Sequence, residues 1–267
     1  MTAPLLAVEH LSVTYPNERA PVRAVDDVSF TVEPGEIVAL VGESGSGKSS
    51  AALALTRLLP PAAAVSGRAV LDGMSLLDAS TADLRAVRGG KVGYVFQDPA
   101  SSLNPVLTIG EQVMETVVLH TPARGADARR AAIDWLKRVG ITAADERLEA
   151  YPHEFSGGMQ QRVCIAMALA ARPSLLIADE PTTALDVTVQ VQILRLLRDL
   201  QRELGLAVVL ISHDLLVVER LARRLGVMRH GRLVEWGDTA QILNRPAQPY
   251  TQELIRARPP AKLRRIV

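Results

Sequence analysis

The sequence predicts an α/β protein with a mostly parallel sheet, an antiparallel β layer and a helical subdomain, and three observations support this fold class. The apolar strand Ile37–Val41 runs directly into a glycine-rich turn that is followed by an apolar helix. Strands and helices alternate from about 156 to 211, the order typical of a parallel sheet. Residues 97–155 lose the strand pattern and contain helical stretches, which indicates a helical insertion.

The glycine-rich turn reads Gly-Glu-Ser-Gly-Ser-Gly-Lys-Ser over residues 42–49, which has the spacing of a phosphate-binding loop. Its glycines permit backbone angles that a Cβ would obstruct, so successive N–H groups can face an anion. The following helix adds the positive end of its dipole. Lys48 is expected to reach the β- and γ-phosphates of a nucleotide, and the Ser49 hydroxyl to ligate Mg²⁺.

Composition limits the class of protein. The 267 residues suit one large domain, or one domain with a subdomain. Apolar residues make up 48% and aromatic residues only 3%, so an aliphatic core is expected. A net charge of +1 does not favour a nucleic-acid partner. Cys164 is the single cysteine and lies in an apolar run, which predicts a buried, inert thiol. With neither a secretory signal nor an apolar run of about 18 residues, a soluble, cytoplasmic chain is expected.

The order of elements follows from local patterns. Alternating or continuous apolar residues bounded by turns predict strands at 5–15, 24–32, Ile37–Val41, 65–72, 91–96, 175–178, 206–211, 224–228 and 232–235. Apolar residues at helical spacing predict helices at 51–58, 80–87, 109–119, 127–139, 156–171 and 189–204. The last of these should bury one face, made of Val189, Ile193, Leu196, Leu200 and Leu204. The prolines between 246 and 249 are expected to loosen the chain.

Two further motifs belong with a phosphate loop. An apolar strand delivers Asp179 and Glu180 at its end, where Asp179 can hold Mg²⁺ and Glu180 can polarise a water. A plain pair of strand-end carboxylates is the alternative. Ser156-Gly157-Gly158 opens a helix and exposes its first N–H groups, which makes a second anion site or an ordinary helix start.

Taken in order, these motifs resemble those of the nucleotide-binding subunit of ABC transporters, which has a P-loop NTPase core, and the resemblance covers nearly the whole chain. Tyr15 is similar to the aromatic residue that stacks on adenine, although it could also be a core tyrosine. His213 resembles the switch histidine, or else it is a histidine satisfied at a strand end. The remaining matches are Walker A at Gly42–Ser49, the Q-loop glutamine Gln97, the signature at Ser156-Gly157-Gly158, Walker B at Asp179-Glu180, and the D-loop Ala184-Leu185-Asp186.

The resemblance implies ATP and Mg²⁺ as cofactors and assigns roles to residues. The implied ATP-binding residues are Tyr15, Gly42, Glu43, Ser44, Gly45, Ser46, Gly47, Lys48, Ser49 and Ser50. The implied catalytic residues are Glu180, His213 and Gln97, and the implied Mg²⁺ ligands are Ser49, Gln97 and Asp179. The signature that would act on ATP bound to a partner chain comprises Ser156, Gly157, Gly158, Met159 and Gln160, and Asp186 represents the D-loop.

Details of the motifs are similar to the peptide/nickel importer branch. The signature reads Phe155-Ser-Gly-Gly-Met159 where the family's usual form is Leu-Ser-Gly-Gly-Gln. Phe96-Gln-Asp-Pro, Leu103-Asn-Pro and the tail Pro249-Tyr-Thr also fit that branch. The resemblance implies one ABC ATP-binding domain, with a RecA-like core at about 1–96 and 172–245, a helical subdomain at about 97–171 and a C-terminal extension at about 246–267.

The expected function is that of an ATP-hydrolysing subunit powering import of peptides, nickel or a related small solute. Its expected partners are membrane-spanning permeases, docked around residues 97–105, a second, related ABC ATPase chain and, indirectly, a substrate-binding protein. Nucleic acid is not expected. The location implied is peripheral, on the cytoplasmic face of the inner membrane. Two alternatives are an exporter cassette, which the importer-like segments argue against, and a soluble ABC ATPase acting on nucleic acid or ribosomes, which would usually carry a coiled-coil insertion or two cassettes.

Overall fold

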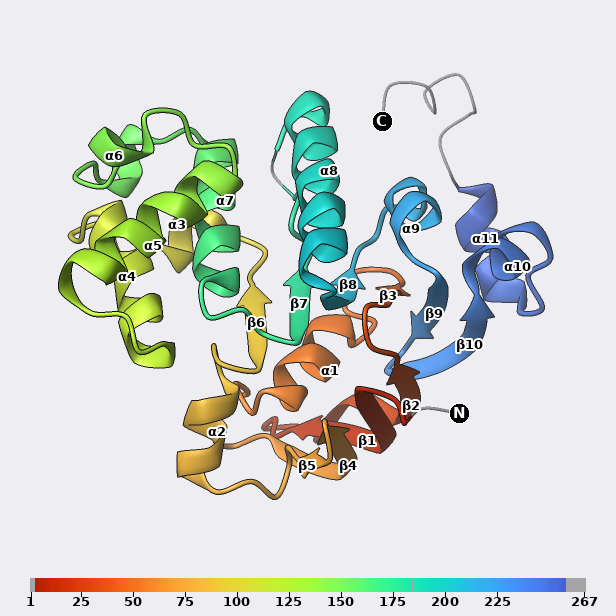
Figure 1. The fold of residues 1–267 in the computed structure, drawn as a ribbon. Helices are drawn as coiled ribbons and strands as arrows, with labels where there is room; N and C mark the ends of the chain where they lie inside the picture. Colours follow the sequence, from red (N-terminus) through yellow and green to blue (C-terminus); the bar gives the residue numbers. More distant parts are fainter. Residues whose placement is uncertain (1–2, 184, 258–267) are drawn as a thin grey trace. The chain divides into compact units, whose positions relative to one another are not determined.

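The computed structural model describes residues 3–183 and 185–257, which fold into two compact units (Figure 1). The first unit combines the chain up to Leu84 with the chain from Ala207 onward, and the second comprises Arg85–Leu206. The chain passes from the first unit to the second within α2 (Thr81–Val87). The predicted limits of the helical subdomain, about 97–171, stay a prediction.

An antiparallel sheet forms the N-terminal part of the first unit, as predicted. Its strands, in spatial order, are β2 (Val22–Val32), β1 (Leu6–Tyr15), β4 (Ala64–Leu71) and β5 (Met74–Ser75). The register of β1 shifts between Val8 and Leu11, where His10 has a positive φ of 52°. The facing residue in β4 is Gly67, whose Cβ, if present, would lie 2.4 Å from the His10 carbonyl oxygen. The sheet therefore needs glycine opposite this irregularity.

The second sheet of this unit contains the predicted parallel strands. Strand β3 (Ile37–Val41) pairs in parallel with β8 (Ala207–Ile211) on one side and with β9 (Arg224–Arg229) on the other, and β9 forms a hairpin with β10 (Arg232–Asp238). All five residues of β8 are buried, as are four of the five in β3. Strands covered on both faces need continuous aliphatic sequence, which explains the runs of Val, Leu, Ile and Ala.

Besides α2, the described residues of the first unit contain four helices. They are α1 (Lys48–Leu55), α9 (Leu215–Leu221), α10 (Thr239–Asn244) and α11 (Pro249–Arg256), the last two following β10 at the right of Figure 1. The expectation that the prolines near 249 loosen the chain was wrong for Pro249, because this residue occupies the first turn of α11. Proline suits that position, since its fixed φ is helical and its missing N–H would have no intrahelical acceptor.

The second unit has a parallel strand pair, β6 (Val92–Val95) with β7 (Leu175–Asp179), and otherwise helices. The helices are α3 (Pro99–Ser102), α4 (Ile109–His120), α5 (Gly125–Arg138), α6 (Ala144–Arg147), the 3₁₀ helix η1 (Pro152–Glu154), α7 (Gly157–Leu169) and α8 (Val187–Leu204). Helix α4 begins with a capping box between Thr108 and Glu111. The thiol of Cys164, on α7, is buried as predicted, and burial followed by the charge of Asp98 raises its pKa to about 12.

The face that α8 buries differs from the predicted one. The buried residues are Val191, Ile193, Leu194, Leu197, Leu200 and Gln201. Ile193 and Leu200 belong to the predicted set, but the buried face is turned toward Leu194 and Leu197. Nine of the eighteen residues of this helix are apolar, so their spacing alone does not fix its orientation.

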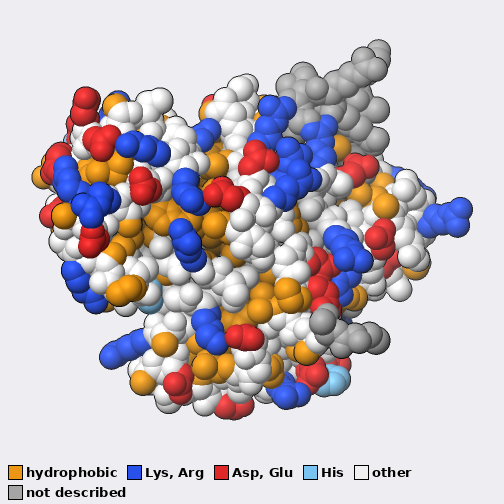
Figure 2. Space-filling model, viewed as in Figure 1, with side chains coloured by type: hydrophobic (Ala, Val, Ile, Leu, Met, Phe, Trp, Pro, Cys, Tyr) orange, Lys and Arg blue, Asp and Glu red, His pale blue; other side chains and the backbone are white. Residues whose placement is uncertain are grey.

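Charged side chains are distributed without one extended basic surface on the face shown in Figure 2, where acidic and basic groups are interspersed with hydrophobic ones. In the described ranges, no helix has the length and apolar character needed to span a bilayer.

Candidate ATP-binding and hydrolysis residues

The glycine-rich loop connects β3 to α1 and requires glycine at two positions. Gly42 has a φ of 154°, and a Cβ there would lie 2.2 Å from the Met228 carbonyl oxygen. Gly47 has a φ of 102°, and its Cβ would lie 2.1 Å from the carbonyl oxygen of Ala24. Neighbouring backbone therefore packs closely against the loop at both ends. A side chain at either glycine would force the loop to move.

Lys48 lies inside the curve of this loop and is only 5% exposed. Its ammonium group donates to the carbonyl oxygens of Gly42 and Glu43, at 2.8 and 2.9 Å, and to Ser46 Oγ at 3.3 Å. These acceptors hold the positive charge at the centre of the loop. A phosphate fits this site because the loop offers it a cation, backbone N–H groups and the start of α1.

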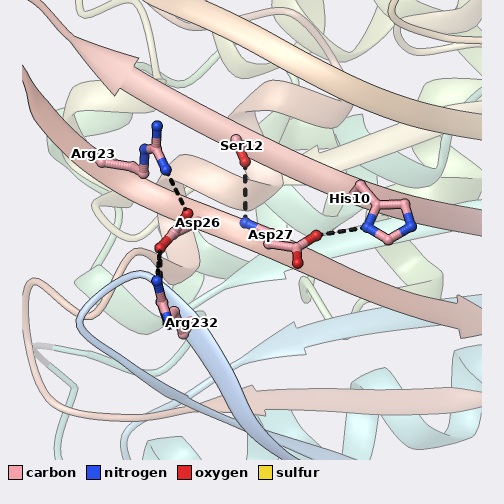
Figure 3. Close-up of polar contacts among 6 residues, drawn as sticks. All are labelled: His10, Ser12, Arg23, Asp26, Asp27 and Arg232. Atoms are coloured by element: carbon pink, nitrogen blue, oxygen red, sulfur yellow. Dashed lines mark hydrogen bonds and ion pairs between the residues drawn. The ribbon is translucent and has the colours of Figure 1, made fainter.

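The turn between β9 and β10 braces the far side of the loop. The Gly231 N–H donates to the Ser46 carbonyl at 3.0 Å, and the Asp26 N–H donates to the Gly231 carbonyl at 2.8 Å. The Asp26 carboxylate also binds Arg232 and Arg23, at 2.7 and 2.9 Å (Figure 3). Hydrogen bonds from Arg232 and then Arg23 lower the pKa of Asp26. Strand β2 and the hairpin thus hold the loop together.

The other predicted residues of the first unit lie around this loop or after β8. The Tyr15 hydroxyl donates to Ser50 Oγ at 3.1 Å, which ties β1 to α1. Glu43, Ser44 and Gly45 are exposed at the tip of the loop. His213 is exposed in the turn between β8 and α9, where Asp214 caps the helix by accepting the Leu216 N–H at 2.7 Å.

In the second unit, β7 ends at Asp179, which is buried and accepts a hydrogen bond from the Tyr94 hydroxyl at 3.2 Å. Tyr94 belongs to β6, which pairs with β7. Burial, followed by the charge of Asp179, raises the pKa of Tyr94 well above its usual value. The phenol therefore stays protonated and remains a donor to the carboxylate.

Glu180 is brought together with the predicted Gln97. One carboxylate oxygen of Glu180 accepts hydrogen bonds from Gln97 Nε2 at 3.2 Å and from Thr183 Oγ1 at 2.8 Å. The Glu180 backbone has a φ of 46°, an uncommon conformation for a residue with a side chain. The strained turn and the two donors fix the direction in which this carboxylate points.

The signature segment begins α7. Ser156 is the N-cap residue, and its hydroxyl accepts the Met159 N–H at 3.4 Å. A Cβ at Gly158 would lie 2.6 Å from Val189 Cγ1, so this glycine permits the close approach of α7 to α8. The Gln160 side chain turns back and donates to the Pro152 carbonyl at 2.8 Å. Its amide therefore braces the segment that precedes the helix.

The D-loop lies just after Thr183. Asp186 caps α8 by accepting the Val189 N–H at 3.0 Å. Ala184, which the motif also includes, lies outside the described residues.

Three polar residues at these sites were missed by the sequence reasoning: Tyr94, Thr183 and Tyr250. The hydroxyl of Tyr250, in α11, accepts a hydrogen bond from the Glu43 N–H at 3.2 Å. Thr183 had a signal, because it follows Glu180 by three residues within the same turn. Tyr94 had none, and Tyr250 appeared only within the branch-like tail Pro249-Tyr-Thr, with no sign of its partner, since only folding brings these two residues to Asp179 and Glu43.

Comparison with known proteins places these motifs in a family. Residues 25–183 match the model of the ABC transporter family. The chain is 52% identical over 97% of its length to the peptidoglycan transport ATP-binding protein YejF of Agrobacterium fabrum and covers 48% of that protein. It is 49% identical over 96% of its length to the dipeptide transport ATP-binding protein DppD of Escherichia coli and covers 78% of that protein. The chain thus spans about half the length of YejF.

Solved structures agree with the fold. The dimeric ATP-binding cassette MJ0796, solved in a post-hydrolysis state with ADP and Pi, superposes with a TM-score of 0.78 and 30% identity, over 88% of this chain and 98% of its own. This likeness confirms the predicted class, an α/β ABC ATPase fold with parallel and antiparallel strands and added helices. By its motifs, its fold and its match over residues 25–183, the chain belongs to the ABC transporter family.

Proposed function

We propose that this chain is the ATP-hydrolysing subunit of an ABC importer for peptides or related small solutes. The observation that carries the proposal is the loop around Lys48, a buried cation surrounded by backbone groups at the start of a helix. The peptide class is supported by relatives such as DppD, named for dipeptide transport.

In the proposed site, Lys48 leaves its carbonyl acceptors and pairs with the phosphates of ATP. The N–H groups of residues 42–50 and the start of α1 contribute to the same phosphates, and Tyr15 packs against the adenine. Ser49, Gln97 and Asp179 would hold Mg²⁺, which prefers the hydroxyl, amide and carboxylate oxygens that they offer. The bound ion would neutralise the charge that develops on the phosphates.

Hydrolysis requires a water aligned with the terminal phosphate. We assign Glu180 to accept a proton from this water, with Gln97 and Thr183 orienting its carboxylate. His213 would donate a hydrogen bond to the transferred phosphate. Tyr94 holds Asp179 in the direction needed for the ion. The products are ADP and phosphate.

The signature segment would complete an ATP site in a partner chain. Residues 156–160, at the start of α7, offer N–H groups but no cation, so they suit the outer side of a phosphate already bound to a Lys48. Asp186 would lie in the same interface. We therefore propose that ATP joins this chain to a second, related ATPase chain and that hydrolysis separates them.

Permease subunits are the proposed membrane partners, and residues 97–105 the proposed docking segment. Two exposed hydrophobic side chains, Phe96 and Val106, which are 42% and 75% exposed, flank this segment. The chain would then act as a peripheral protein on the cytoplasmic face of the membrane and would depend indirectly on a substrate-binding protein.

Reconstitution tests this function. The chain, combined in proteoliposomes with its permeases, its partner ATPase and the cognate binding protein, should drive ATP-dependent uptake of a labelled peptide. The Glu180→Gln chain should bind ATP but support no uptake. Uptake of Ni²⁺ alone, or export of the peptide, would contradict the proposed substrate class or direction.

A further inference from the structure

The C-terminal helix α11 contacts the phosphate-binding loop through Tyr250. Tyr250 is 4% exposed, and its hydroxyl accepts the Glu43 N–H at 3.2 Å. The two residues are 207 positions apart, so this bond joins the end of the described chain to the loop. A buried tyrosine usually places its hydroxyl against a polar partner, and here that partner is loop backbone.

The bond matters because of the peptide group it reaches. The Gly42 carbonyl and the Glu43 N–H belong to the same peptide group, which is trans, like the other peptide bonds of the described residues. In a trans peptide these two groups point in opposite directions. Lys48 Nζ binds the carbonyl at 2.8 Å, and Tyr250 binds the N–H. Lys48 and Tyr250 therefore hold one peptide group from opposite sides.

Tyr250 is itself fixed in place by two neighbouring groups. The guanidinium carbon of Arg229, at the end of β9, lies 4.6 Å from the centre of its ring. The Glu235 carboxylate accepts the N–H groups of Ala247 and Gln248, at 2.8 and 3.3 Å, just before α11 begins. The β9–β10 hairpin and the start of α11 thus position the Tyr250 hydroxyl against the loop.

We propose that Tyr250 is a positioning residue for nucleotide binding, acting through the Gly42–Glu43 peptide group. When Lys48 turns toward a phosphate, the carbonyl of this peptide loses its cation. The hydrogen bond to the Tyr250 hydroxyl remains and prevents the peptide group from rotating. The N–H groups that follow in the loop therefore stay directed toward the anion. This inference rests on the proposed role of Lys48 in binding ATP.

The test uses Tyr250→Phe in the full chain, which removes the hydroxyl and keeps the ring against Arg229. Thr251→Val is the matched control, because Thr251 is equally buried in α11 and its hydroxyl has no hydrogen-bond partner among the described residues. Calorimetric titration with MgADP should show about three- to tenfold weaker binding for Tyr250→Phe, the effect of one lost hydrogen bond, and no change for the control. The KM for ATP should rise with little change in kcat.

Two further measurements separate the possible failures. In thermal unfolding without nucleotide, the midpoint of Tyr250→Phe should fall by only a few degrees, as expected for one lost hydrogen bond, so the variant stays folded at the temperature of the titration. Lys48→Ala reports on the proposed site itself, and if it binds MgADP normally, the assignment of the loop fails. If Lys48→Ala loses binding while Tyr250→Phe keeps the wild-type affinity and KM, the positioning role of Tyr250 is overturned.

Discussion

The side-chain amide of Gln97 donates a hydrogen bond to the Glu180 carboxylate at 3.2 Å, so the residue that follows β6 by two positions orients the residue that follows β7. The same carboxylate oxygen accepts the Thr183 hydroxyl. Because β6 and β7 are parallel neighbours, their carboxyl ends bring the two side chains together. A movement of Gln97 would therefore change the orientation of the proposed catalytic carboxylate, Glu180.

Glu180→Gln should retain ATP binding and lose turnover, because an amide cannot accept the proton of an attacking water. Phosphate release should fall by about a hundredfold or more, the usual contribution of a general base. Glu149→Gln is the matched control, since Glu149 is an exposed glutamate that pairs with Arg129. Normal turnover in Glu180→Gln would assign the base to another group, such as His213.

Lys48→Ala should abolish hydrolysis and strongly weaken ATP binding, because it removes the cation at the centre of the loop. Titration with ATP and measurement of phosphate release both check this. Lys137→Ala, which removes an exposed lysine paired with Asp145 at 3.1 Å, should behave as wild type. Wild-type affinity and turnover in Lys48→Ala would rule out the loop as the ATP site.

Tyr94→Phe should raise the Mg²⁺ concentration needed for half-maximal hydrolysis by a few fold, since Asp179 loses the donor that orients it and one hydrogen bond is worth about 1 kcal/mol. Tyr151→Phe serves as the control, because Tyr151 is an exposed tyrosine of the same unit. An unchanged Mg²⁺ dependence would show that Asp179 is held by other contacts.

Arg224→Ala should lower the free energy of unfolding by about 3 kcal/mol, because it leaves the buried carboxylate of Glu36 without its cation. Arg224 Nε donates to Glu36 at 2.7 Å and Arg224 also binds the Thr31 carbonyl at 3.0 Å. Urea unfolding measures the change. Arg68→Ala, in the exposed pair with Glu9, should cost less than about 1 kcal/mol.

This pair should also make stability depend on pH. Burial opposes ionisation of Glu36, but hydrogen bonds from Arg224 and from the Glu33 N–H outweigh it, so the pKa of Glu36 is lowered below 4.5. The contribution is therefore complete above the unfolded pKa and lost as the pH falls through the lower, folded pKa. In Arg224→Ala, stability should fall less steeply between about pH 5 and 3 than in the wild type. Equal slopes would contradict this.

A cysteine at Ser101 should crosslink to a co-expressed permease if residues 97–105 form the docking segment. Ser101 is exposed on α3. The native Cys164 should not compete, because its thiol is buried and its pKa is raised to about 12 by burial and by Asp98, which leaves little thiolate at neutral pH. Val22→Cys, exposed on β2, is the control. Crosslinks from Val22→Cys alone would contradict the assignment.

Much of the fold could be predicted because its signals are local. The continuous apolar run of β3 and the glycines that follow it predict a buried strand and a tight loop from the local sequence alone. The buried face of α8 could not be predicted, since Leu194 and Leu197 compete with Ile193 and Leu200 and only packing decides. Helix α11 was missed because a proline was taken to loosen the chain, when at a first helical position it starts a helix.

The candidate site divides in the same way. Lys48, Asp179 and Glu180 are recognisable from motifs with fixed spacing. Tyr94, which donates to Asp179, is brought to the site by strand pairing, and Tyr250, which binds the Glu43 N–H, by a contact over most of the chain length. No local pattern encodes either contact. Their roles in ATP hydrolysis stay predictions until the variants above are measured.

The pressure of neighbouring backbone on Gly42 and Gly47 has a thermodynamic consequence. The carbonyl groups of Met228 and Ala24 leave no space for even a methyl group beside these glycines. Contacts with β9 and β2 therefore fix the conformation of the loop before a nucleotide binds. Without these contacts, its glycines would have more backbone freedom than any other residue type. The conformational entropy of the loop is therefore lost when the chain folds. A nucleotide that binds the loop loses its own translational and rotational freedom but orders the loop little further.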